Sequence, residues 1–161
     1  MNIFFDVDFT LVGVDGSLRP GVKEVLQRLR EDGHRVYLWS GLRVPWDAAD
    51  RHGLTDLIHG CYAKPIEDHR SWVARLQIPE PHFCIDDNQE TIAVFGGYTI
   101  SPYIYPEHPD EHMWRVYQAI VEHVTNGHTT PRAYGYGAEH LNRNGTFSAH
   151  DRGSERPALP E

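Results

Sequence analysis

The stretch FFDVDFTLVG, residues 4 to 13, decides how the rest of the chain is interpreted. An apolar run leads into two carboxylates, Asp6 and Asp8, which stand one residue apart. Either a buried strand ends here in a solvated turn, or the strand delivers both acids to a site. Because alternate residues of an extended segment share a face, both acids could act on one ligand. The residues that follow the other strands decide between these interpretations.

Strand-like and helix-like segments alternate along most of the chain. Strands are expected over 2–5, 35–40, 57–63, 82–87 and 98–105, and helices over 19–34, 44–54, 66–78 and 110–124, with a short helix or turn near 88–95. In the first helix, apolar residues recur at helical spacing between Pro20 and Gly33, which suit its start and its end. The alternation predicts crossover connections, and therefore a Rossmann-like three-layer α/β sandwich with a central parallel sheet.

Length and charge narrow the class of protein. The 161 residues suffice for one domain, and the net charge of -8 disfavours a nucleic-acid partner or a membrane surface. No apolar run is long enough to span a bilayer, and the N-terminus does not resemble a signal peptide. Cys61 and Cys84 both lie in apolar stretches, so we expect buried free thiols and a cytoplasmic location.

The pattern of strands and helices stops near residue 126. The segment 126–161 is rich in Gly, Pro, His, Asn and Ser, and its apolar residues are too scattered to form a face. We therefore expect a folded domain over 1–125 and a low-complexity, flexible C-terminal tail over 126–161.

Polar side chains follow four of the expected strands. Since ligands of an open parallel sheet bind at its carboxyl edge, these residues should converge there. The residues are Asp6, Asp8 and Thr10, then Ser40 and Gly41, then Lys64, then Asp86 and Asp87. Carboxylates this close repel one another unless a cation lies among them, and hard oxygen ligands favour Mg²⁺. A carboxylate beside that metal could attack phosphorus, with a neighbouring acid moving the proton and Lys64 neutralising phosphoryl charge.

These motifs resemble the haloacid dehalogenase superfamily of phosphatases over roughly residues 1–105. The motifs that carry the resemblance are FFDVDFTL at the first strand, VYLWSG at the second, AKP after the third and CIDDN at the fourth. The resemblance implies that Asp6 is the nucleophile, that Asp8 is the general acid and base, and that Lys64 assists catalysis. Thr10 resembles the residue that braces the loop. The substrate phosphate-binding set expected from the resemblance is Thr10, Ser40, Gly41 and Lys64.

The resemblance also implies the metal ligands. Mg²⁺ would be held by Asp6, by the backbone carbonyl of Asp8 and by one acid of the adjacent pair, for which we favour Asp87 with Asp86 in support. Phe9 departs from the commonest pattern, because the family often has Gly at this position. Phe9 could be a packing residue or an aromatic wall beside the leaving group, and the sequence leaves both open.

The gaps between motifs are too short for the cap domain that many family members carry. In the family, a capless site often accompanies large phosphorylated substrates or a partner subunit that acts as a lid, and small-molecule substrates also occur. The sequence therefore leaves the size of the substrate undecided and allows a homo-oligomer. Residues 106–161 could instead fold over the site. The leading prediction is a Mg²⁺-dependent phosphomonoester hydrolase that forms an aspartyl-phosphate. The alternatives are a phosphotransferase, a phosphate-ligand binding module without turnover and, disfavoured by the presence of Asp8, a dehalogenase.

Overall fold

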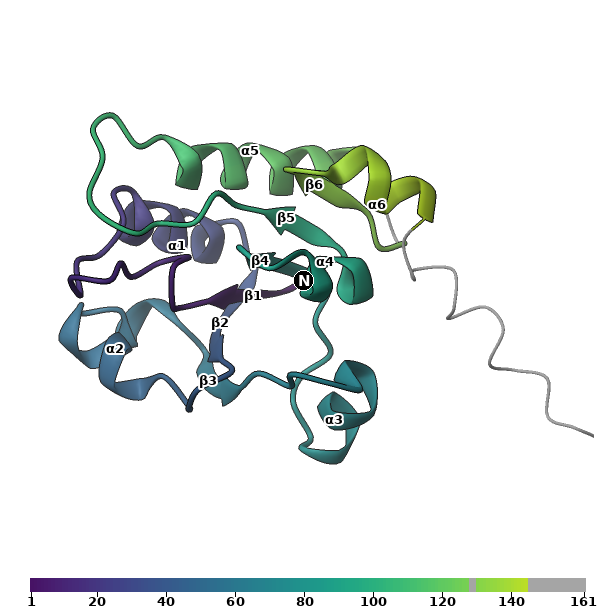
Figure 1. Cartoon of the computed structure of the whole chain (residues 1–161), viewed down its shortest axis with the longest axis horizontal. Coiled ribbons are helices and arrows are strands. Elements are labelled where there is room, and N and C mark those ends of the chain that lie inside the picture. Colours follow the sequence, from purple (N-terminus) through teal and green to yellow (C-terminus); the bar gives the residue numbers. More distant parts are fainter. Residues whose placement is uncertain (128–129, 145–161) are drawn as a thin grey trace, which may run out of the picture.

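The computed structural model describes residues 1–127 and 130–144. Within these residues, six strands form one parallel sheet in the order β3-β2-β1-β4-β5-β6 (Figure 1). Their bounds are β1 Asn2–Asp6, β2 Arg35–Ser40, β3 Gly60–Ala63, β4 Phe83–Asp86, β5 Gly97–Thr99 and β6 Ala133–Gly135. The predicted central parallel sheet is therefore confirmed.

Helices cover both faces of the sheet. They are α1 Val22–Glu31, α2 Trp46–Arg51, α3 His69–Arg75, α4 Gln89–Phe95, α5 His112–Thr125 and α6 Ala138–Asn144, with a 3₁₀ turn, η1, over Thr55–Leu57. Buried residues of α1, α2 and α5 share one apolar core, and those of α3, α4 and α6 share a second core. Figure 1 shows α1 and α5 side by side on the same face. The molecule is thus a three-layer α/β sandwich, and residues 1–127 and 130–144 include no cap domain.

The sequence of β1 explains why it lies at the centre. Ile3, Phe4 and Phe5 are fully buried, and β1 pairs with β2 on one side and β4 on the other. Alternate side chains enter opposite cores, since Ile3 and Phe5 belong to one apolar cluster and Phe4 to the other. The chain runs outward from β1 to β3 and returns to place β4 beside β1. This reversal is the point at which open α/β sheets bind ligands, and Asp6 ends β1 there.

Three strands are shorter than their patterns predict, β4 by one residue at each end and β3 and β5 by more. β3 begins at Gly60 because residues 55–57 form η1 instead. β5 ends at Thr99, and the following residues leave the sheet to contact the loop after β1, where the Tyr103 N–H donates to the Phe9 carbonyl at 2.7 Å. β5 begins at Gly97, where φ is +131° and a Cβ would collide with the backbone of Cys84. A strand of three residues that begins with a glycine offers little periodic signal.

The prediction of a flexible tail over 126–161 is wrong for residues 133–144, which form β6 and α6. Tyr134 and Leu141 bury enough apolar surface to attach this segment to the sheet and to α4. Asn142 also donates to the Ala133 carbonyl and accepts from the Ala133 N–H, so that its side chain completes the hydrogen bonds of the outer strand. The rest of the predicted tail, 145–161, and residues 128–129 lie outside the described residues.

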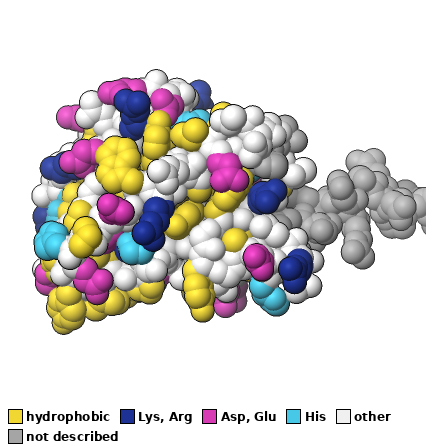
Figure 2. Space-filling model, turned by 90° about the horizontal axis from the view of Figure 1, so that it is seen from above, with side chains coloured by type: hydrophobic (Ala, Val, Ile, Leu, Met, Phe, Trp, Pro, Cys, Tyr) yellow, Lys and Arg dark blue, Asp and Glu magenta, His cyan; other side chains and the backbone are white. Residues whose placement is uncertain are grey.

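Cys61 and Cys84 are buried free thiols, as their apolar contexts predict. Among the described residues, no helix combines the length and the apolar character needed to cross a bilayer. Figure 2 shows the molecule from the side of α5, where Lys and Arg side chains are scattered among acidic ones rather than gathered in one field. That face therefore offers no continuous cationic surface of the kind that binds nucleic-acid backbones.

Candidate functional site

The predicted site residues come together at the carboxyl edge of the sheet. Asp6 ends β1, Ser40 ends β2, Lys64 follows β3 and Asp86 ends β4. The Lys64 Nζ lies 2.8 Å from the Asp6 Oδ1 and 2.9 Å from the Asp86 Oδ2, so that one ammonium joins the ends of β1 and β4. The parallel topology therefore converts four distant segments into one cluster of charged groups.

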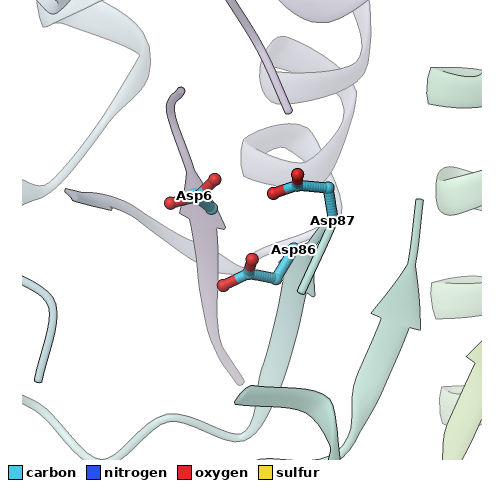
Figure 3. Close-up of side chains that lie close together, drawn as sticks. All are labelled: Asp6, Asp86 and Asp87. Carbon is cyan, nitrogen blue, oxygen red and sulfur yellow. The ribbon is translucent and has the colours of Figure 1, made fainter. Parts of the chain in front are cut away.

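Three of the acids surround a common space. Asp6, Asp86 and Asp87 each offer an oxygen within 4.8 Å of the others, and Figure 3 shows their side chains grouped at the ends of β1 and β4. Burial, and then the charge of Asp86, raise the pKa of Asp6 to about 7, although Lys64 opposes that rise. Burial and Asp86 also raise the pKa of Asp87. The negative charge of the cluster is thus only partly compensated by protein groups. A small divalent cation with a preference for oxygen ligands fits this donor set.

The two adjacent acids occupy different environments. Asp86 is fully buried, and both of its oxygens accept hydrogen bonds, one from Lys64 and the other from the Asn88 N–H at 2.9 Å. Asp87 is only partly buried, and its Oδ1 lies at the long distance of 3.5 Å from the Thr10 hydroxyl. Asp87 therefore has the more available carboxylate. This geometry favours Asp87 as a direct metal ligand and Asp86 as a residue that positions Lys64 and the following turn.

Thr10 lies behind Asp6 rather than in front of it. Its side chain is fully buried, and its hydroxyl donates to the Asp6 Oδ2 at 3.0 Å. The resemblance also predicts Thr10 among the substrate phosphate-binding residues, but a buried hydroxyl that already donates to Asp6 has no access to a substrate. The geometry instead agrees with its other expected role, which is to brace the loop and fix the orientation of Asp6.

Lys64 places its ammonium between two carboxylates, and its side chain is 13% exposed. Burial by itself lowers the pKa of Lys64, but the carboxylates of Asp6 and Asp86 outweigh burial and raise it to about 12. Lys64 is therefore charged throughout the physiological range. Its charge lies where it would neutralise a phosphoryl group attached to Asp6.

Ser40 holds the second acid of the first motif. Its hydroxyl donates to the Asp8 Oδ2 at 2.7 Å and accepts from the Leu42 N–H at 3.2 Å. The sequence does not reveal this link between Ser40 and Asp8, because it depends on side-chain conformation. Gly41 lies exposed beside Lys64, and a Cβ there would come within 3.2 Å of the Ile66 side chain. Ser40 and Gly41 thus lie where the sequence predicts, with Ser40 also orienting Asp8.

Phe9 occupies a conformation that glycine adopts easily and phenylalanine rarely does. Its φ is +60°, and it lies in a tight turn in which the N–H groups of residues 10, 11 and 12 all donate to the Val7 carbonyl. The Phe9 side chain is 41% exposed. Packing alone poorly explains an aromatic ring that is this exposed. The structure therefore favours Phe9 as an aromatic wall beside the leaving group over Phe9 as a packing residue.

Sequence reasoning missed the group that anchors this loop. Arg19 is buried and pairs with Asp110, with 2.9 Å between Nε and Oδ2. Its other nitrogens donate to the carbonyls of Thr10 and Ser101 at 3.1 and 2.9 Å. Arg19 therefore ties the loop after β1 to the segment after β5. Nothing in the local sequence marks Arg19, because its partners lie up to 91 residues away.

Comparison with known proteins supports the fold and no more. No protein family has a model that matches the chain, and no curated protein matches it. Among solved structures, the chain is similar to an uncharacterized protein from Listeria monocytogenes serotype 4b, with a TM-score of 0.57 and 14% identity. That alignment covers 78% of this chain and 99% of the other. A second solved chain, also 14% identical, aligns over 97% of this chain and 98% of its own with a TM-score of 0.45, too low to carry an argument.

Proposed function

We propose that the protein is a Mg²⁺-dependent phosphomonoester hydrolase in which Asp6 is the nucleophile. The observation that carries the proposal is the environment of the Asp6 carboxylate. One of its oxygens accepts from Lys64 and the other from Thr10, and Asp86 and Asp87 each offer an oxygen close enough to share a cation with Asp6. This arrangement fixes a nucleophile beside groups that would neutralise phosphoryl charge. It also agrees with the motif resemblance to the haloacid dehalogenase phosphatases.

The chemistry divides into two displacements at phosphorus. In the first, a carboxylate oxygen of Asp6 bonds to phosphorus, the bond to the ester oxygen breaks, and Asp8 gives its proton to the departing alcohol. In the second, Asp8 takes a proton from water as the water oxygen attacks phosphorus, which releases inorganic phosphate and restores Asp6. The hydrogen bond from Ser40 engages only the Oδ2 of Asp8, so the Oδ1 is free to carry the proton.

The remaining groups position the reactants. Thr10 orients the nucleophile, and the ammonium of Lys64 faces the oxygens that gain charge during the transfer. When held by Asp6, by Asp87 and by the backbone carbonyl of Asp8, Mg²⁺ would supply further positive charge beside the phosphoryl oxygens. Lys64 and the metal would thus share the neutralisation of a site that protein groups alone leave negative.

The test is phosphate release from a chromogenic aryl phosphate by wild type, Asp6→Asn and Asp47→Asn. Asp47 is an exposed acid of α2, so its replacement controls for the loss of one charge. We expect release that needs Mg²⁺, that stops with a chelator, and that falls at least about 10³-fold in Asp6→Asn only. Turnover that survives in folded Asp6→Asn would overturn the assignment of the nucleophile. Tight binding of phosphorylated ligands by wild type without any release would favour a binding module.

A further inference from the structure

A cavity lies beside Lys64, on the side of the site away from β4. Its volume is about 260 Å³, and it opens between the loop after β2 and helix α3. Gly41 and Lys64 form its inner wall, and Ile66, Trp72 and Leu76 contribute apolar side chains. These three side chains are 74%, 38% and 49% exposed. Large apolar groups gathered around one hollow, and left in contact with water, are typical of a ligand site rather than of ordinary surface.

The cavity borders the proposed phosphate site, with which it shares Lys64 and Gly41. Lys64 lines it, and the ammonium of the same residue contacts Asp6 and Asp86. Gly41 lines it as well, and directly follows Ser40, whose hydroxyl holds Asp8. Asp8 is the residue that would protonate the departing alcohol. An alcohol that leaves towards Asp8 therefore lies next to the entrance of the cavity.

Charge and size limit what the cavity accepts. Its charged lining residues are Lys64, whose ammonium already contacts two carboxylates, and Glu67, an acid. A second phosphate or another anionic group would meet Glu67 with no free cation in the lining. The volume lies just below the range of drug-sized pockets, roughly 300–1,000 Å³, and suits one ring. Arg75 lies 5.0 Å from the ring centre of Trp72, which stabilises the orientation of that ring.

We propose that this cavity binds the alcohol portion of a small phosphomonoester that carries one aromatic ring or an apolar group of similar size, with no second anionic group. The proposal rests on the proposed function for the identity of the phosphate site. It adds the substrate class, which the residues of the phosphate site alone do not define. Trp72 and Ile66 would contact the ring.

The kinetic test compares benzyl phosphate with ethyl phosphate, since both esters release primary alcohols. We expect wild type to have a higher kcat/KM for benzyl phosphate, and Trp72→Ala to lower that value about tenfold while changing ethyl phosphate less than about twofold. The matched control is Trp114→Ala, because Trp114 is 44% exposed on α5, away from the cavity. Equal kcat/KM for the two esters in wild type, or an equal loss for both in Trp72→Ala, would overturn the proposal.

A binding measurement separates failure of the cavity assignment from failure of the hydrolase assignment. Benzylphosphonate and ethylphosphonate cannot be hydrolysed, so calorimetry with Mg²⁺ present reports binding alone. The cavity assignment predicts tighter binding of benzylphosphonate by wild type, and loss of that preference in Trp72→Ala, whether or not esters turn over. No release from any ester would then count against the proposed function only. Equal binding of the two phosphonates by wild type would count against the cavity.

Discussion

Asp6 depends on a hydroxyl that the substrate cannot reach. The Thr10 side chain is buried and donates to the Asp6 Oδ2, while Arg19 holds the backbone of Thr10 from the other side. The orientation of the proposed nucleophile is therefore fixed by two buried residues. Such support allows the reacting groups to be placed before the substrate binds.

Thr10→Val removes this donor and keeps the shape of the side chain. We expect a loss of about 1–2 kcal/mol in the free energy of unfolding and a loss of activity, because a buried carboxylate oxygen loses its partner. Urea unfolding and phosphate release measure the two effects. Thr55→Val is the matched control, since Thr55 also donates to an aspartate, Asp50, but on the surface. Equal losses of unfolding free energy in the two variants would show that the buried hydrogen bond from Thr10 stabilises the protein no more than the exposed one from Thr55.

Phe9 carries a conformational cost that can be measured directly. Phe9→Ala and Phe9→Gly both remove the ring, but only glycine relieves the positive φ of 60°. We expect the glycine variant to be more stable than the alanine variant by about 1 kcal/mol. At Leu42, which is exposed and is not among the residues with positive φ, the order should be reversed. Urea unfolding of the four variants gives both differences, and a more stable alanine variant at Phe9 would contradict the strained backbone.

At the scale of the elements, the ends of β1, β3 and β4 are joined by charge. Lys64 follows β3 and contacts Asp6 on β1 and Asp86 on β4. Asp6 is buried, so the stability of this junction depends on the protonation of Asp6. Because the pKa of Asp6 is raised from 3.8 to about 7, the folded protein keeps a proton that the unfolded chain has lost in this range. Asp6 therefore lowers metal-free stability as the pH rises from about 4 to 7.

Asp6→Asn should remove the part of the pH dependence of stability that comes from Asp6. Burial lowers the pKa of several histidines, which favours the folded state as the pH rises and opposes the effect of Asp6. These are His34, His52, His59, His69 and His82. The informative quantity is thus the difference between wild type and Asp6→Asn in urea unfolding with a chelator. We expect that difference to grow in favour of Asp6→Asn between pH 4 and pH 7, and a difference that stays constant would contradict the raised pKa.

In wild type, addition of Mg²⁺ should oppose the loss of stability that accompanies rising pH. A cation bound by deprotonated carboxylates stabilises the folded protein more at pH 7.5 than at pH 5, because binding at the lower pH must first displace protons. The stabilisation should be absent from Asp6→Asn if Asp6 is a ligand. Equal stabilisation of both proteins would place the cation elsewhere.

At the scale of the whole molecule, the sequence predicts the parts that depend on pattern and topology. The alternation of elements predicts the parallel sheet, and a parallel sheet brings Asp6, Ser40, Lys64 and Asp86 to one edge because all its strands run the same way. The partners of each side chain were not predictable in this manner. The bonds of Ser40 to Asp8 and of Thr10 to Asp6 depend on side-chain conformation, and the Arg19–Asp110 pair joins segments far apart in the chain.

The missed strand β6 has a different cause. It contributes one short edge strand whose buried residues, Ala133 and Tyr134, are followed at once by Gly135. A segment this short has no measurable periodicity, and its stability comes from Asn142 and from the adjacent strand β5. Local pattern thus predicts elements that carry their own apolar face, and fails for those that depend on tertiary contacts.

The central claim is that Asp6 bonds covalently to the phosphoryl group. The most direct measurement is acid quenching of wild type, Asp8→Asn and Asp6→Asn during turnover of a ³²P-labelled phosphomonoester with Mg²⁺, followed by isolation of the peptide that contains Asp6. The account predicts label on that peptide in wild type and none in Asp6→Asn. With an aryl ester, whose leaving group needs no proton from Asp8, it predicts more label in Asp8→Asn because water attack is slowed. Turnover by wild type with an unlabelled peptide at every quench time would contradict it and would indicate direct attack by water on the substrate.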